Sequence, residues 1–238
     1  MLKSSPVCFR SDEACRQLIL ARLGIQVSAP QVESEILSKA EGNPLFAEEL
    51  VQYFSATASV PHTQPGATLP VPSTVQDLVM ARVDRLPEQL RTVLRTAAVV
   101  GRRFGGGVIQ RACAPGGAAV EDLERLEHED LIRSDREPER REYIFKHALI
   151  QEAIYDSLLS PQRAVLHERV AESLEAEYPD QLQEWSDVLA HHYSRTTRHQ
   201  KAARYLVFSG ERHLQASSLT EAERCFREAI AHLESEGP

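Results

Sequence analysis

The segment Gly42-Asn43-Pro44 has residue types that can hold an anion at the start of a helix. Glycine ends one helix, asparagine caps the next, and proline takes the first helical position, where its missing N–H has no consequence. The free N–H groups and positive dipole end of a helix attract phosphate, and a proline ring offers a flat apolar face to a base. The end of one helix and the start of the next also explain all three residue types without any ligand. The sequence therefore leaves two interpretations open, a nucleotide contact and a purely structural turn.

The sequence lacks the loops that carry out phosphoryl transfer. Gly-x-x-x-x-Gly-Lys-Ser/Thr does not occur, and no Lys-Ser/Thr follows Gly105-Gly106-Gly107, so we interpret that run as a loose turn. No apolar strand ends in Asp-Glu to bind magnesium, and the serine-nucleophile signature Gly-x-Ser-x-Gly is absent. We therefore expect that this chain alone catalyses nothing.

Nine histidines and four cysteines raise the question of a metal site. The adjacent pair His191-His192 points in different directions on a helix, which disfavours joint chelation. No His-x-x-x-His pair lies beside a cysteine or carboxylate at a zinc spacing. The cysteines are scattered, without Cys-x-x-Cys. We expect no metal ligands, and reduced thiols in a cytosolic protein.

The scattered cysteines favour a cytoplasmic protein. The composition favours Leu/Val/Ala-rich cores, because 42 % of the residues are hydrophobic and only 6 % are aromatic. The net charge of −8 argues against a chain whose task is to coat nucleic acid or an anionic membrane. No apolar run approaches the ~20 residues of a membrane span. Met1–Arg10 lacks the apolar core of a signal peptide. We expect neither a membrane partner nor a nucleic-acid partner.

Helical periodicity predicts a mainly α protein that begins with a small helical bundle over residues 1–54. The last helix of this bundle starts at Pro44, and Glu48 and Glu49 lie early enough to favour its positive end. Residues 55–72 contain four prolines and almost no charge, which predicts an extended linker.

Residues 73–147 change from helical to strand-like periodicity. Helices, including a short one over Val108–Cys113, are followed by two short strands, Leu131–Ser134 and Glu142–Lys146, joined by a charged turn. Helices followed by a two-stranded hairpin are typical of a winged helix. We therefore predict a winged-helix domain over residues 73–147.

Residues 148–238 are helical again and end in a repeat-like pattern. Gly210, Ala222, Phe226 and Ala229 occupy the small-residue and aromatic positions of one tetratricopeptide unit. Small residues allow two antiparallel helices to approach closely, and Phe226 fills the gap between them. A single unit cannot bury its own faces, since about three or more are normally needed. We expect a helical arm and the opening of a tetratricopeptide-like array, in a chain that is part of a larger one.

Several stretches resemble STAND-class signal-transduction ATPases, the regulatory branch of the AAA-like P-loop ATPases. Glu41–Tyr53 (EGNPLFAEELVQY) resembles their helical lid. Leu94–Phe104, Phe145–Tyr155 and Leu166–Ala171 resemble the winged-helix domain of bacterial LuxR-type regulators and cyclase-associated ATPases of that class. The resemblance covers nearly the whole chain and is more generic over residues 200–234.

The resemblance implies roles for four residues. Gly42, Asn43 and Pro44 match the lid motif whose proline lies against adenine, and His147 matches the winged-helix histidine that contacts the β-phosphate of ADP. The implied cofactor is ATP or ADP, bound together with a P-loop ATPase domain supplied in cis or in trans. The implied partner of the tetratricopeptide-like region is a protein or small-molecule effector. A histidine packed against the wing remains an equal interpretation of His147.

Two other functions remain open. A stand-alone tetratricopeptide-like interaction adaptor would bind no nucleotide. A DNA-binding winged helix is disfavoured, because the basic residues of the hairpin are nearly balanced by acids, which leaves about +1 charge. A more basic stretch contains five arginines and only Glu88 as an acid: Arg91, Arg95, Arg102, Arg103 and Arg111.

Overall fold

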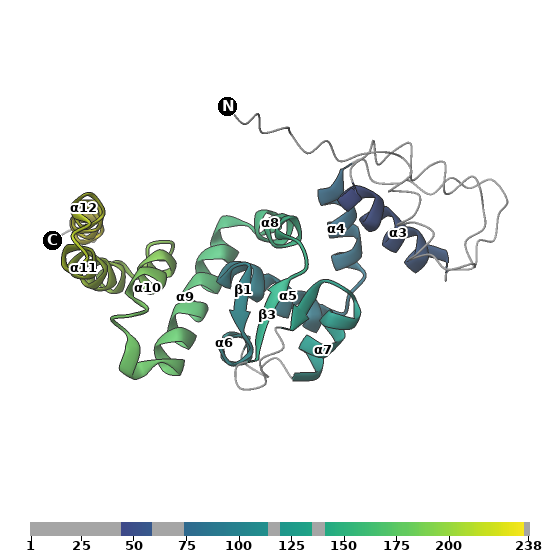
Figure 1. Cartoon of the computed structure of the whole chain (residues 1–238), viewed down its shortest axis with the longest axis horizontal. Helices are drawn as coiled ribbons and strands as arrows, with labels where there is room; N and C mark the ends of the chain where they lie inside the picture. The colour runs from purple at the N-terminus through teal and green to yellow at the C-terminus, as the bar shows by residue number, and fades with distance from the viewer. Residues whose placement is uncertain (1–43, 59–73, 114–119, 135–140, 236–238) are drawn as a thin grey trace, which may run out of the picture. The chain divides into compact units, whose positions relative to one another are not determined.

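The structure is a computed structural model that describes residues 44–58, 74–113, 120–134 and 141–235. It is mainly helical with one small sheet, which confirms the prediction of a mainly α protein (Figure 1). The chain divides into two compact units, residues 1–85 and residues 86–238. Among the described residues, no helix combines the length and the apolarity needed to cross a bilayer.

In the described part of the first unit, α3 (Pro44–Ala58) packs against α4 (Val75–Asp84). Helix α3 begins at Pro44, as the sequence predicted, where the fixed φ of proline suits the first helical turn. Helix α4 follows Thr74, whose hydroxyl oxygen accepts a hydrogen bond from the backbone N–H of Asp77 at 3.0 Å. The boundary between the two units follows α4, after Arg85.

Glu49 does not serve the positive end of α3, so that prediction is wrong. The first turn of α3 contains no acidic residue, and the carboxylate of Glu49 is fully buried. It pairs there with the guanidinium of Arg82 on α4, whose side chain is only 9 % exposed. The guanidinium of the nearby Arg85 lies over the ring of Tyr53, 4.8 Å from its centroid. Helices α3 and α4 are thus joined by a buried ion pair and a cation–π contact.

The second unit begins with helices and short strands in alternation and continues as a series of helices. In chain order its elements are α5 (Glu88–Val100), β1 (Arg103–Gly105), α6 (Gly106–Ala112), α7 (Val120–His128), β2 (Ile132–Ser134), β3 (Glu142–Phe145), α8 (Ala148–Ser157), α9 (Ser160–Glu177), the 3-10 turn η2 (Pro179–Gln181), α10 (Ser186–Tyr193), α11 (His199–Gln215) and α12 (Leu219–Ser235).

The sheet has the strand order β1-β3-β2, and both pairings are antiparallel. Strands β2 and β3 confirm the predicted hairpin, with Ile132 opposite Phe145. Strand β1 was not predicted from the sequence. It places Phe104 opposite Tyr143, and the ring centroid of Phe104 also lies 5.5 Å from that of Phe145. This aromatic cluster ties the short strand β1 to the hairpin.

Gly105-Gly106-Gly107 is not a loose turn, which corrects the sequence interpretation. Gly105 ends β1, and α6 starts at Gly106, two residues before the predicted helix. The backbone N–H of Gly106 donates to the carbonyl oxygen of Arg141 at 2.9 Å. A Cβ atom at Gly106 would lie 3.3 Å from that same oxygen and 3.3 Å from the ring of Tyr143. Glycine therefore allows α6 to begin in close contact with β3.

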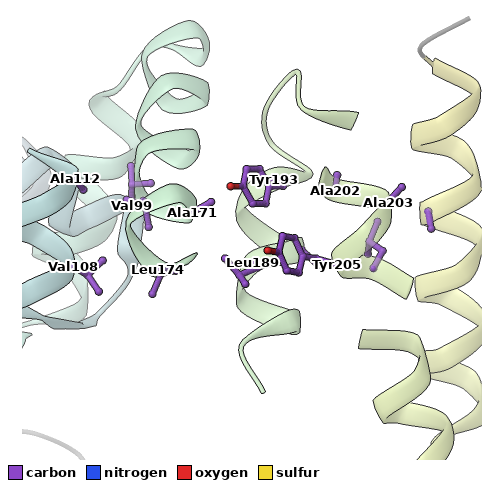
Figure 2. Packing of buried hydrophobic residues seen from close by; sticks show 14 of the residues in the cluster. Val99, Val108, Ala112, Ala171, Leu174, Leu189, Tyr193, Ala202, Ala203 and Tyr205 are labelled. Atoms are coloured by element: carbon purple, nitrogen blue, oxygen red, sulfur yellow. The ribbon is translucent and has the colours of Figure 1, made fainter. Parts of the chain in front are cut away.

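The core of the second unit is continuous from α5 and α6 through α9 to the last three helices (Figure 2). As predicted, alanine, valine and leucine dominate it. Two buried tyrosines add bulk in the arm, where the rings of Tyr193 on α10 and Tyr205 on α11 stack with centroids 5.6 Å apart. Helix α9 contacts α5 and α6 on one side and α10 on the other.

Helices α11 and α12 form an antiparallel pair in which Gly210 meets Phe226. A Cβ atom at Gly210 would lie 2.7 Å from Cε1 of Phe226, so the ring occupies the space that any larger residue would need. The sequence analysis predicted that a small residue would allow two helices to approach and that Phe226 would fill the gap between them. The contact of Gly210 with Phe226 confirms this prediction. Ala222 and Ala229 are buried on the same helix pair.

Glu175 of α9 links three helices. Its carboxylate accepts hydrogen bonds from Lys201 Nζ at 2.8 Å and from Tyr205 Oη at 2.6 Å, and Lys201 Nζ also donates to Tyr193 Oη at 2.9 Å. Burial raises the pKa of Glu175, but the hydrogen bonds from Lys201 and Tyr205 outweigh it, so the pKa lies below its usual range.

Glu175→Gln is expected to lower the unfolding free energy at pH 7 by about 1–3 kcal/mol, because the charge-assisted bonds are lost. Since the folded-state pKa is depressed, this stabilisation is present above the unfolded pKa of about 4.3 and is lost as pH falls through the folded pKa. Urea unfolding between pH 7 and pH 3 should therefore show the wild type and the variant converging in acid. The exposed Glu172→Gln on the same helix is the control. A difference that stays constant with pH would contradict the expectation.

Candidate functional site

The residues predicted to contact nucleotide are only partly within the described chain. Gly42 and Asn43 lie outside the described residues, and Pro44 is the first residue of α3. His147 occupies the predicted junction between strand and helix as the N-cap residue of α8. Its backbone is extended, with φ −131° and ψ 143°, and its carbonyl accepts from the N–H of Ile150 at 3.1 Å. Pro44 and His147 belong to different compact units.

His147 is placed at a helix start that can receive an anion. Its side chain makes no capping hydrogen bond to the first turn of α8. The N–H groups of the first turn of a helix point away from its body, and the dipole there is positive. This arrangement agrees with the predicted phosphate contact and equally with a packed histidine, and both interpretations of His147 remain.

A polar pocket that sequence reasoning did not identify lies among α10, α11 and α12. Its volume is about 550 Å³, and its lining carries both signs of charge. The charged and polar residues that line it are Asp187, His191, Ser194, Arg195, Ser209, His213, Glu221, Arg224 and Glu228.

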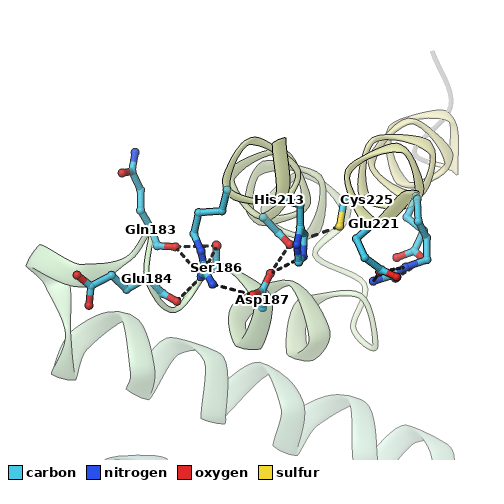
Figure 3. A network of polar contacts seen from close by, with 11 residues as sticks. Gln183, Glu184, Ser186, Asp187, His213, Glu221 and Cys225 are labelled. Atoms are coloured by element: carbon cyan, nitrogen blue, oxygen red, sulfur yellow. Dashed lines mark hydrogen bonds and ion pairs between the residues drawn. The ribbon is translucent and has the colours of Figure 1, made fainter. Parts of the chain in front are cut away.

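Asp187 is the centre of the polar network at this pocket (Figure 3). Its carboxylate accepts a hydrogen bond from Ser209 Oγ, pairs with Arg212 Nη2 at 3.0 Å and lies 3.6 Å from His213 Nε2. Arg212 Nη1 also donates to the carbonyl oxygen of Glu184 at 2.5 Å. These contacts attach α11 to the start of α10 and hold the Asp187 carboxylate in place.

The network does not have the arrangement of a Ser-His-Asp triad. Ser209 Oγ donates directly to Asp187 and lies 3.4 Å from Cys225 Sγ, whereas the serine of such a triad donates to a histidine. The opposite side of the pocket carries Arg224, which pairs with Glu221 at 3.0 Å and Glu228 at 2.9 Å. The arrangement therefore suits the binding of a polar ligand of mixed charge.

One helical spacing in the sequence could have indicated part of this pocket. Ser209 and His213 are four residues apart and therefore share a face of α11. Asp187 could not have been added to them, because it lies on a different helix and only the packing of α10 on α11 brings it near.

A second, apolar groove lies between α5 and α9. Its volume is about 370 Å³, and Val165, which lines it, is 50 % exposed. The residues that line it are Thr92, Arg95, Leu158, Pro161, Gln162, Val165 and Leu166.

The predicted basic patch is partly neutralised. Arg91 and Arg95 pair with Glu88 at 2.5 and 3.3 Å, and Arg111 pairs with Glu177 of α9 at 2.7 Å. In the hairpin, Lys146 is only 1 % exposed and pairs with Asp130. These ion pairs reduce the positive charge that is available to bind the phosphate backbone of a nucleic acid.

One group of histidines has the proximity that metal ligands require. Among the described residues, His167, His191 and His192 are the group whose ligand atoms come within 4.8 Å of one another. The sequence analysis considered the adjacent pair and His-x-x-x-His spacings, and neither includes His167, which lies on a different helix, α9.

Comparison with known proteins finds two similarities. A family described as "Domain of unknown function (DUF8739)" matches residues 11–57, a range that includes most of α3. The chain is also 29 % identical over 197 residues to "Uncharacterized protein R02095" of Rhizobium meliloti (strain 1021). That match covers 79 % of this chain but 19 % of the relative, so the chain spans about one fifth of the length of this relative.

Proposed function

We propose that this chain is the regulatory portion of a STAND-type signal-transduction ATPase, comprising the lid, the winged helix and the start of a tetratricopeptide-like sensor, and that it catalyses nothing by itself. The observation that carries the proposal is the element order α5-β1-α6-α7-β2-β3 with the sheet order β1-β3-β2. A helix, a strand, two helices and a hairpin that pairs with the first strand are the elements of a winged helix. His147 directly follows this set, at the start of α8.

The helices that follow support a sensor role. Gly210 and Phe226 make the close contact that a tetratricopeptide-like pair requires. The polar pocket among α10, α11 and α12 offers a place for an effector. The long relative of Rhizobium meliloti agrees with a chain that works beside further domains. The switch consists of ADP held between a P-loop domain, the lid and the winged helix, and released when an effector binds the arm.

His147→Ala tests the nucleotide role in the natural polypeptide or complex that contains these residues. Loss of one hydrogen bond to the β-phosphate, at about 1.4 kcal/mol, should speed the release of a fluorescent ADP analogue roughly tenfold. The exposed His128→Ala at the end of α7 is the matched control and should leave release unchanged. Equal release from the wild type and the His147 variant would remove this residue from the mechanism.

The alternative is a stand-alone tetratricopeptide-like interaction adaptor without nucleotide. Its support is the apolar groove between α5 and α9, which needs no phosphate chemistry to bind a partner. Analysis of the purified natural protein for bound nucleotide and for accompanying proteins separates the two functions. If it retains no ADP, and no P-loop protein accompanies it, the adaptor is favoured.

A further inference from the structure

Three imidazole rings meet between α9 and α10. The ring of His167 lies with its centroid 5.0 Å from that of His192 and 5.9 Å from that of His191. The rings of His191 and His192 are 5.3 Å apart and almost perpendicular, with an interplanar angle of 89°. Adjacent residues on one helix do point in different directions, but the packing of α9 on α10 places His167 beside both of them.

Two ring nitrogens of the cluster face each other and share one hydrogen bond. His167 Nδ1 and His192 Nδ1 lie 2.8 Å apart, so one of them donates its N–H to the other, and an ion that both nitrogens ligate must displace this proton. Tyr155 Oη lies 3.1 Å from His167 Nε2. When the proton of His167 resides on Nε2, it is donated to Tyr155 and Nδ1 can ligate an ion. Second-sphere partners of this kind commonly fix the tautomer and the orientation of histidine ligands.

Burial favours the neutral form of all three imidazoles, which is the form that ligates a metal. Burial, with the nearby Arg195 charge next, lowers the pKa of His167 to about 3. Burial and the neighbouring histidines lower the pKa of His192 to about 2. Burial and Arg195 also lower the pKa of His191.

One group opposes a cation. Arg195 Nη1 lies 3.1 Å from His191 Nδ1 and donates to the His191 carbonyl oxygen at 2.8 Å. Because the guanidinium occupies Nδ1, the ligand atom of His191 is its Nε2. The positive charge of Arg195 weakens cation binding through Coulomb repulsion. Substitution of Arg195 therefore provides a test of the site.

We propose that His167, His191 and His192 bind one divalent transition-metal ion of the zinc class. Imidazole-only ligand sets suit Zn²⁺, Cu²⁺ and Ni²⁺ and not Mg²⁺ or Ca²⁺. Bonds of about 2.0–2.1 Å in a tetrahedron separate ligand nitrogens by about 3.3 Å. A pair at the observed limit of 4.8 Å must therefore close by about 1.5 Å, whereas the Nδ1 atoms of His167 and His192, at 2.8 Å, must separate by about 0.5 Å. The fourth position would hold water. His191 is exposed and also lines the polar pocket, so the ion reaches the cluster from that side.

Zn²⁺ titration of the full chain, after removal of metal with a chelator, tests the proposal. The expected result is one Zn²⁺ per chain with a raised thermal midpoint, and Co²⁺ in its place should give the absorption of a tetrahedral site. His191→Ala is exposed and should fold normally, but should weaken Zn²⁺ binding at least tenfold. His167→Gln should do the same. No stoichiometric binding, or binding that survives both changes, would overturn the proposal.

A second pair of histidines provides the matched control. His199 Nδ1 and His232 Nδ1 lie 3.0 Å apart on α11 and α12, but within the described part of the chain no third ligand atom joins them to form a comparable group. His199→Ala should leave Zn²⁺ affinity unchanged. Arg195→Gln should tighten Zn²⁺ binding several-fold, because it removes the opposing charge. This gain in affinity cannot come from damage to the fold, and weaker or equal binding in Arg195→Gln would count against the site.

Discussion

Glu49→Ala is expected to destabilise the α3–α4 pair by about 3–5 kcal/mol, one of the two largest effects that the structure implies for a single substitution. The carboxylate of Glu49 is fully buried and pairs with Arg82, whose side chain is 9 % exposed. Removing the carboxylate takes the Glu49 charge away from a guanidinium that lies in a poorly hydrated place. Hydrogen exchange of the α3 and α4 amides should rise accordingly, since it reports the opening of these helices.

Two further variants make this expectation specific. Gln76→Ala changes an exposed residue of α4 and should leave exchange as it is. The double substitution Glu49→Leu with Arg82→Met replaces both charges by apolar groups and should recover most of the protection, because a buried pair can often be exchanged for hydrophobic residues with little loss. If Glu49→Ala leaves α3 protected, the ion pair does not hold the two helices together.

Gly210→Val is expected to destabilise the second unit by about 1–3 kcal/mol through overpacking. Even a Cβ atom would lie 2.7 Å from Cε1 and 2.8 Å from Cζ of Phe226, and the branched side chain of valine needs more room still. Thermal unfolding followed by circular dichroism measures the effect. The fluorescence of Trp185, the one tryptophan of the chain, reports on the same core.

The Gly210 experiment has an internal control and a rescue. Glu211→Val adds similar bulk at the next position of α11, which is exposed, and should change stability little. Phe226→Leu in the Gly210→Val background should restore part of the loss, because the smaller side chain gives back the space. Additive losses in the double variant would mean that valine acts through something other than the ring of Phe226.

Three features that depend on local patterns were predicted correctly from the sequence. The start of α3 at Pro44, the hairpin β2–β3 and the contact of Gly210 with Phe226 all follow from signals within a few residues or within one helix pair. Strand β1 was missed because three residues carry too little periodicity, and its identity depends on pairing with β3, far along the chain.

The candidate sites were harder to predict for the same reason. Glu49 was interpreted as a helix-end charge, because nothing near it in sequence shows that Arg82 lies opposite. The histidine cluster needs His167 from α9, and the polar pocket needs three helices. Charges and imidazoles become a site only through tertiary packing, which a single sequence does not display.

Helix α9 has a consequence for how the chain can be dissected. One face of this helix covers Val99, Val108 and Ala112, and its residues Ala171 and Leu174 continue the same core toward α10 (Figure 2). A truncation at residue 147, where the strands end, would remove this cover and expose the apolar side chains of α5 and α6 to water. Such a fragment should aggregate, because large exposed apolar patches associate. Expression of separate pieces should therefore keep residues 86–235 intact, so that the sheet and the arm are produced together.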